Sequence, residues 1–213
     1  MMVNKMKIFK YSLVLLLLLL SGCTGSKSKK SGPAYFYLNQ NRNLSSVGRT
    51  ILVELSNDSA YPKVSSDVTD ALYEAIQKKQ LFGINVVRKN DPAWRNLQLD
   101  NFTGYSLDQL SAIHKTLKAE AVLRGTITRY EPYPHLILGL RLELLDLKDG
   151  QLLWALEQIW DADDKNTQDR VKDFYDKTII PFGDGLEKGL GVVSSLKFFK
   201  FIAYETAETL QHK

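Results

Sequence analysis

The chain has 213 residues, and 44% of them are hydrophobic, which is enough for a folded core and argues against a disordered protein. Its formal charge of +4 comes from lysines near the N-terminus: without the six lysines before residue 31, 22 basic residues stand against 24 acidic ones. The remaining chain is slightly acidic, so it lacks the basic face that nucleic-acid binding needs.

The N-terminal segment has the pattern of an export signal. Lysines at 5, 7 and 10 precede a leucine-rich run over 13–20, and Leu20, Ser21 and Gly22 then lead to Cys23, the only cysteine of the chain. Small residues before a cysteine form the cleavage box of a lipoprotein signal peptide. We therefore predict a signal peptide over 1–22 and a diacylglyceryl group on Cys23, which becomes the first mature residue.

Two alternatives explain this segment less well. A transmembrane helix needs about 20 apolar residues, and the stretch 8–20 is shorter and contains Lys10. A plain secretory signal would make the Leu-Ser-Gly-Cys spacing a coincidence. A single cysteine also excludes an intramolecular disulfide.

The lipid would attach the chain to a membrane, because two or three acyl chains give a stable anchor. Residue 24 is Thr. In lipoproteins of the enteric type an Asp at this position retains the protein at the inner membrane. Similarity to that sorting rule favours the periplasmic face of the outer membrane, with the inner membrane or the cell surface as alternatives.

Residues 23–48 are expected to form a polar, lipidated tether rich in Gly and Ser. Lysines 27, 29 and 30 lie in this tether, where they are either solvated or in contact with anionic headgroups. The run Tyr35-Phe36-Tyr37-Leu38 interrupts it. This run either packs back onto the domain or serves as a short recognition segment.

The next residues predict alternating strands and helices. We expect strands at 50–55, 84–87 and 121–127, helices at 64–80 and 106–117, and irregular structure at 91–105. Ser106 and Gln109 form a capping box at the start of the second helix, whose inward residues should be Leu107, Leu110, Ile113 and Leu117.

A long β-hairpin is predicted over 136–160. Leucines alternate with other residues from 136 to 144, and Asp149-Gly150 suits a type I′ turn. Two helices should follow, one over 164–180 and one that begins at Ser194 or Ser195. The fold class is therefore α/β (α+β): a mixed sheet of about five strands in the order β-α-β-α-β-β-β, with helices packed on it and two C-terminal helices.

This order, together with the segments Leu81-Phe82-Gly83, Val86-Val87-Arg88 and Arg124-Gly125-Thr126-Ile127, resembles a periplasmic α/β domain. The curli-secretion channel CsgG, the penicillin-binding-protein activator LpoB and the N-terminal domain of TolB share that domain. The resemblance implies a domain over 49–162, followed by a helical appendage over 163–213. A pore of the curli type needs membrane-spanning hairpins, and the 136–160 hairpin carries Arg141, Glu143, Asp146 and Glu157.

Chemical signatures of an enzyme are missing from the sequence. The histidines at 114, 135 and 212 show no metal-ligand spacing, and there is no phosphate loop or nucleophile elbow. The acidic run Asp161-x-Asp163-Asp164 is better explained by a helix N-terminus than by calcium. We therefore expect no catalytic residue, no metal and no cofactor.

Loop aromatics are the remaining candidates for function. Trp94, Phe102 and Tyr105 either contact a partner or form a satellite core. The sequence predicts a membrane-anchored module that binds an envelope protein without catalysis. The alternative is a subunit of a homo-oligomeric export or assembly complex of the curli type.

Overall fold

The computed structural model describes residues 32–33, 35–99, 104–178 and 194–211. The strands are β1 (Phe36–Leu38), β2 (Thr50–Val53), β3 (Ser56–Asn57), β4 (Ile84–Val87), β5 (Ala121–Glu131), β6 (Ile137–Asp146) and β7 (Leu152–Asp161). The helices are η1 (Leu44–Ser46, a 3-10 turn), α2 (Val64–Lys79), α3 (Pro92–Asn96), α4 (Leu107–Leu117), α5 (Lys165–Thr178) and α6 (Ser195–Glu208).

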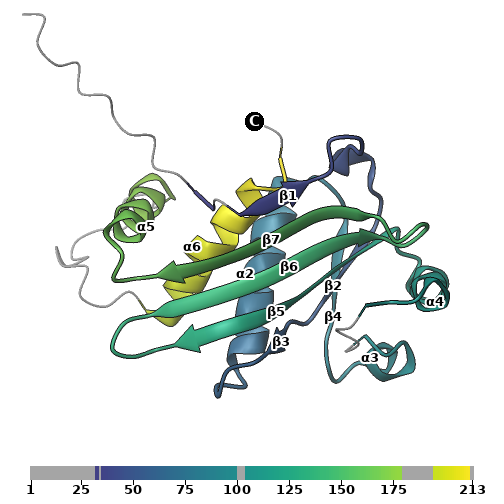
Figure 1. Ribbon diagram of the computed structural model, residues 1–213, viewed down its shortest axis with the longest axis horizontal. Coiled ribbons are helices and arrows are strands. Elements are labelled where there is room, and N and C mark those ends of the chain that lie inside the picture. The colour runs from purple at the N-terminus through teal and green to yellow at the C-terminus, as the bar shows by residue number, and fades with distance from the viewer. Residues whose placement is uncertain (1–31, 34, 100–103, 179–193, 212–213) are drawn as a thin grey trace, which may run out of the picture. The chain divides into compact units, whose positions relative to one another are not determined.

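All seven strands form one mixed sheet in the order β1-β7-β6-β5-β2-β4, with β3 beside β5 (Figure 1). The predicted α+β class and the predicted element order are confirmed. Two strands were not predicted, β1 and β3. They have only three and two residues, too few for a periodic pattern, and they pair with strands far away in the sequence.

The sheet has a parallel half and an antiparallel half. β2 runs parallel to both β4 and β5, and all four of its residues are buried, which suits a strand covered on both faces. β5, β6 and β7 form an antiparallel meander in which Thr126 pairs with Arg141 and Arg141 pairs with Glu157.

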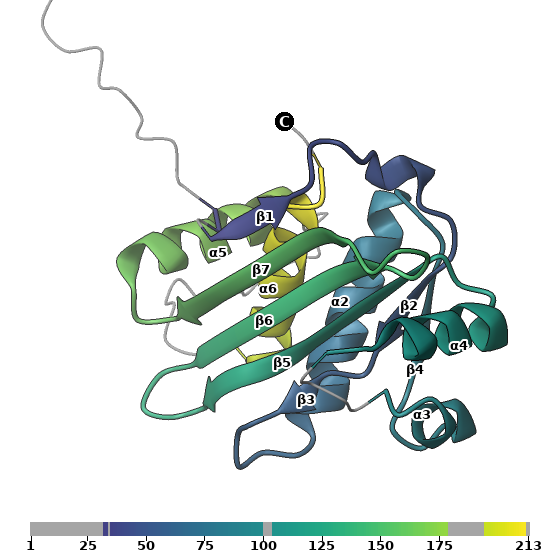
Figure 2. The same ribbon diagram turned by 45° about the vertical axis from the view of Figure 1, so that its right-hand side comes forward.

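One face of the sheet is covered by α2 and α6, which lie behind the strands in Figures 1 and 2. The core between them includes the alternating leucines of β6 and the tryptophans of β7, together with Phe198, Phe199, Phe201 and Ile202 of α6. The domain boundary at 162/163 stays a prediction. In the structure, α6 shares the main core of the sheet.

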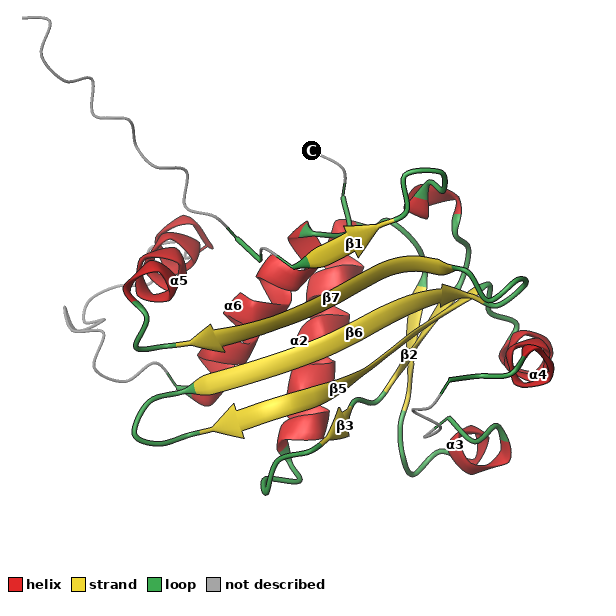
Figure 3. Ribbon diagram, in the orientation of Figure 1, coloured by secondary structure: helices red, strands yellow, loops and turns green. Residues whose placement is uncertain are grey.

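The opposite face is covered over β2, β4 and the start of β5, where α3 and α4 build a second, smaller core with Ile51, Val53 and Val122. Over the rest of β5 and over β6, β7 and β1 no helix of the described residues lies on this face, as Figure 3 shows in colour. We call this uncovered area the open face. Its side chains project from the antiparallel half of the sheet.

Segments before β2 also belong to the folded part. β1 pairs antiparallel with β7, and Leu44 is buried in the main core. The tether that was expected to reach residue 48 therefore ends before β1, and the alternative that Tyr35–Leu38 packs back onto the domain is confirmed. The start of the tether at Cys23 lies outside the described residues.

Two local expectations are corrected and one is confirmed. The segment 91–105 contains the short helix α3, which has Pro92 in its first turn, where the missing amide costs nothing. Leu107, expected to point inward, is 69% exposed because it is the first residue of α4 and lies on its outer side. The capping box of Ser106 and Gln109 is confirmed.

The hairpin turn between β6 and β7 is not type I′. Only Gly150, at +72°, has a positive φ there, and Asp149 does not. The amide of Gly150 donates to the carbonyl of Asp146 at 3.0 Å, and the amide of Asp146 donates to the carbonyl of Gln151 at 2.9 Å. The connection is therefore a longer loop over 147–150 with glycine at its last position.

Candidate functional site

The open face carries two neighbouring rows of side chains that cross the strands. One row runs from Arg124 through Glu143 and Ala155 to Tyr37, and the next from Thr126 through Arg141 to Glu157. Successive residues of a strand point to opposite faces, so these residues share the face that α2 and α6 leave free. The leucines between them point into the main core.

Two arginines on this face have a carboxylate partner on the next strand. Nε and Nη2 of Arg124 donate to Oε2 of Glu143 at 3.0 and 2.7 Å, and Nη2 of Arg141 donates to Oε1 of Glu157 at 2.7 Å. The hydrogen bond from Arg141 lowers the pKa of the Glu157 carboxyl, so this pair stays ionised at neutral pH.

The Arg141–Glu157 pair adds little to the stability of the fold. The side chains of Arg141 and Glu157 are 59% and 63% exposed, and such pairs contribute about 0–1 kcal/mol. A row of fixed, opposite charges on an exposed sheet face is instead suited to orienting a charged or polar partner.

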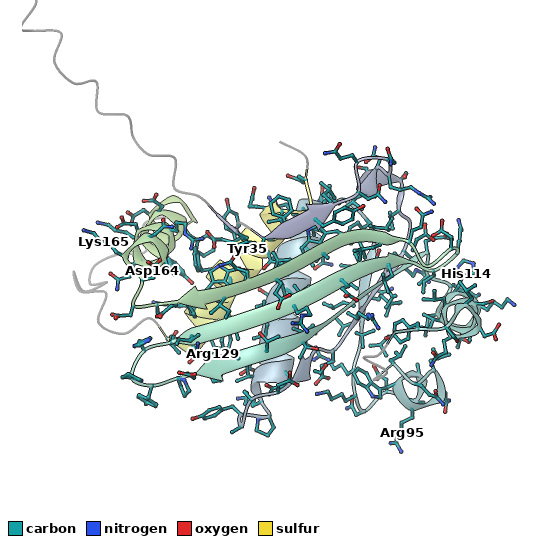
Figure 4. All side chains as sticks on the ribbon, viewed as in Figure 1. Tyr35, Arg95, His114, Arg129, Asp164 and Lys165 are labelled. Carbon is teal, nitrogen blue, oxygen red and sulfur yellow. The ribbon has the colours of Figure 1, made fainter. Side chains whose placement is uncertain are left out.

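A depression of about 370 Å³ lies on the open face beside the charged rows. Tyr35 and Tyr37 line one side of it, Arg141, Glu143 and Glu157 the other, and the small side chain of Ala155 lies between them. Figure 4 places Tyr35 at the start of β1, next to β7. Tyr37 pairs with Ala155, whose small side chain leaves room for the depression.

This site was not predicted from the sequence. The residues between the leucines of β6 were visible as Arg141 and Glu143, and their alternation was the available signal. Their meeting with Tyr37 depends on the pairing of β1 with β7, across more than 100 residues of sequence, which no local pattern reveals.

The predicted aromatic cluster is divided. Trp94 is only 6% exposed and packs in the smaller core with Val87 and Ile113. Tyr105 is half-buried, its hydroxyl donates to the carbonyl of Leu99 at 2.9 Å, and the guanidinium of Arg124 lies 4.9 Å from its ring centre. Phe102 lies outside the described residues. Partner contact by these residues stays a prediction, whereas the structure places Trp94 in a satellite core.

A serine, a lysine and a carboxylate meet at the carboxyl ends of β2 and β4, a common ligand position in α/β folds. Nζ of Lys89 donates to Oγ of Ser65 at 3.1 Å, and Glu54 accepts from Ser65 at 3.3 Å and from the Lys89 amide at 3.2 Å. Ser65 is 2% exposed, and its hydroxyl also bonds the carbonyl of Leu55. A buried hydroxyl with these partners cannot reach a substrate; the group fastens α2 to β2.

The acidic run after β7 forms a helix cap, as the sequence indicated. Asp164 directly precedes α5 and accepts hydrogen bonds from the Thr167 amide at 2.8 Å and from its hydroxyl at 2.9 Å. These bonds lower the pKa of the Asp164 carboxyl. Asp161 instead faces His135, whose Nε2 lies 3.4 Å from its carboxylate. Among the described residues, no group of three His, Cys, Asp or Glu side chains is placed to hold a metal.

The predicted cleavage box (Leu20, Ser21, Gly22) and Cys23 lie outside the described residues, as does His212. Signal cleavage and lipidation therefore stay predictions. Within the part of the chain that the structure describes, none of the helices has the length and apolar character to cross a membrane.

The sequence matches no model of a known protein family and no curated protein. Solved structures show similarity of fold. The PelC dodecamer from Paraburkholderia phytofirmans is 13% identical with a TM-score of 0.44, covering 65% of this chain and 88% of that one. Lipoprotein GNA1162 from Neisseria meningitidis is 12% identical with a TM-score of 0.42, covering 61% and 94%.

The C-terminal domain of LpoB from Escherichia coli is 15% identical with a TM-score of 0.36, covering 54% of this chain and 83% of that one. LpoB belongs to the groups that the sequence resembles, and the resemblance to CsgG and TolB stays an expectation. At TM-scores below 0.5 these similarities assign neither a family nor a function to the chain.

Proposed function

We propose that this chain is an envelope lipoprotein, anchored through acylated Cys23, whose domain binds a protein partner through the open face and performs no catalysis. The observation that carries the proposal is the open face itself, a surface of β5, β6, β7 and β1 that no helix of the described residues covers and that holds paired charges beside an aromatic-lined depression. The sequence before Cys23 supports export, and the residue after it favours the outer membrane.

The composition of this surface supports protein binding. Tyrosine and arginine are enriched among the residues that dominate interface energies, and here Tyr35, Tyr37 and Arg141 line one depression. The Arg124–Glu143 and Arg141–Glu157 pairs hold their side chains in fixed positions, so less freedom is lost on binding.

A second candidate partner is another copy of the chain, as in a homo-oligomeric assembly complex. Arg141 and Glu143 lie two residues apart on the same face of β6. A two-fold axis between them would place Arg141 of one copy opposite Glu143 of the next, so this part of the surface is self-complementary.

Two exposed ion pairs allow a matched test. Arg141→Glu reverses a charge on the open face, and Arg88→Glu makes the same change in the Arg88–Asp70 pair, which joins the end of β4 to α2 away from the open face and is 38% and 51% exposed. Cross-linking and pull-down from envelope extract should lose a partner about tenfold or more with Arg141→Glu and retain it with Arg88→Glu. Equal capture by both variants would remove the open face as the binding surface.

Two further measurements accompany this test. Cys23→Ser should abolish labelling with radioactive palmitate, and labelling of that variant would contradict lipidation at Cys23. Light scattering of the unlipidated chain separates the two candidate partners: a monomer favours a different protein, and a stable dimer or ring favours another copy of the chain.

A further inference from the structure

Three consecutive aromatic residues at the edge of the sheet are open to solvent. Tyr35 is 74% exposed, Phe36 is 45% exposed and Tyr37 is 48% exposed. Because the side chains of a strand alternate, Tyr35 and Tyr37 lie on the side of the open face and Phe36 on the side of the helices. We call these three residues the aromatic edge.

The aromatic edge is held firmly on the domain. β1 pairs with β7 in a defined register, Phe36 opposite Leu156 and Tyr37 opposite Ala155. The Glu157 amide donates to the Tyr35 carbonyl at 3.1 Å, and the Asn39 amide donates to the Leu153 carbonyl at 2.9 Å. β1 is the last strand on its side of the sheet, so these three residues lie along the outer edge of the sheet.

The position of this edge in the chain connects it to the membrane. Tyr35 follows Cys23 by 12 residues, and lysines 27, 29 and 30 lie between them. A chain spans at most about 3.3–3.6 Å per residue, so Tyr35 lies within about 40 Å of Cys23 whatever the conformation between them. If Cys23 is acylated, the aromatic edge lies in and just before β1, which is the first described strand after the bilayer anchor.

We propose that the aromatic edge inserts into the lipid–water interface and fixes the orientation of the domain on the bilayer. Tyrosine suits that interface, because its ring is apolar and its hydroxyl reaches water. The three preceding lysines would be attracted to anionic headgroups. This inference rests on the proposed lipidation of Cys23 but not on the identity of the protein partner. It assigns Tyr35 and Tyr37 to the lipid interface, so the partner would contact the charged rows of the open face rather than these two rings.

Membrane contact at this edge has a consequence for the open face. β6 and β7, which carry Arg141 and Glu157, follow β1 directly in the sheet. The charged rows would then stand beside the bilayer and present themselves to a partner that is itself at the membrane.

The test uses the acylated mature chain, residues 23–213, in vesicles of phosphatidylethanolamine and phosphatidylglycerol. The three tryptophans, Trp94, Trp154 and Trp160, are at most 6% exposed, so a tryptophan introduced at the surface reports its own surroundings. Tyr35→Trp places the probe on the aromatic edge. Tyr133→Trp is the matched control, because Tyr133 is 83% exposed in the loop between β5 and β6.

Brominated lipids should quench the tryptophan at 35 at least about twofold more than the tryptophan at 133. Equal quenching at both positions, or none at 35, would overturn the proposal. Mass spectrometry of the same sample establishes acylation: an unmodified Cys23 would overturn both the anchor and this inference, whereas an unquenched probe on an acylated chain overturns only the inference.

A second copy of the chain is the competing occupant of the edge. Cys23→Ser protein without vesicles should be monomeric in light scattering. A dimer that disappears with Phe36→Ser, whose side chain lies on the other side of the sheet from the open face, would show that the edge binds another copy, and it would overturn membrane contact.

Discussion

The guanidinium of Arg170 on α5 lies against the carboxylate of Glu205 on α6, and both side chains are almost fully buried, at 11% and 9% exposure. Oε2 of Glu205 also accepts a hydrogen bond from Nε1 of Trp160 at 2.8 Å, and Nη2 of Arg170 donates to the Thr167 hydroxyl at 3.2 Å. One carboxylate therefore joins β7, α5 and α6. Burial raises the pKa of Glu205, although Trp160 and Arg170 oppose this.

Arg170→Met should destabilise the domain in a pH-dependent way. It leaves the Glu205 carboxylate buried without its cation, a change that costs about 3–5 kcal/mol at neutral pH. A carboxyl with a raised pKa binds a proton more readily in the native state than in the unfolded state. The loss of stability caused by Arg170→Met should therefore be greatest above the pKa of Glu205 and should shrink as the pH falls through that pKa.

Urea unfolding of both proteins between pH 7 and pH 4 measures this difference. Arg129→Met is the control, because it breaks an exposed ion pair and should cost less than about 1 kcal/mol at every pH. A constant loss across the pH range for Arg170→Met would contradict the role given to Glu205.

Gly125→Ala should weaken the pairing of β5 with β6. A Cβ at this position would lie 2.4 Å from the Arg141 carbonyl oxygen and from a methyl carbon of Leu142. The backbone of β6 cannot move away from the added Cβ without weakening its hydrogen bonds to β5. We therefore expect a loss of about 2 kcal/mol or more in the free energy of unfolding. Gly83→Ala is the control, since no atom lies within 4 Å of its added Cβ. Equal stability of the two variants in thermal unfolding would refute the close approach.

Trp94→Ala should act on stability rather than directly on a surface contact. The side chain is 6% exposed in the smaller core, and removing a buried tryptophan costs about 3–5 kcal/mol. Chemical denaturation of the variant measures the loss. Trp94→Phe keeps most of the packing and should recover much of the stability that Trp94→Ala loses. A fully stable Trp94→Ala protein that fails to capture a partner would instead support the anchor role.

Local signals in the sequence predicted the local structure well. Ser106 and Gln109 cap α4 because two orphan amides need partners, and Ser194 caps α6 for the same reason. Asp164 caps α5, as its place between a strand and a helix indicated. The errors lie where local pattern is weak: Pro92 begins a helix only five residues long, and Asp149 does not adopt the positive φ that a type I′ turn requires.

The candidate site was harder to predict from the sequence than the secondary structure. Arg141 and Glu143 were visible between the leucines of β6, but not their neighbours on β1 and β7. A three-residue strand such as β1 carries no periodicity, and its place was decided by hydrogen bonds to β7. Trp94 was ambiguous because an aromatic residue in a loop has the same sequence pattern whether it is buried or exposed.

The sequence by itself determined the mixed α+β class, the order of the main elements and the predicted lipid anchor at Cys23, because periodicity, capping and cleavage boxes are local properties of the chain. Only the tertiary structure decided which sheet face stays open, that Tyr35 and Tyr37 face Arg141 and Glu157 across one depression, and that Arg170 meets Glu205. These relationships join residues far apart in the sequence. They depend on strand register and helix packing, which are defined only in the folded chain.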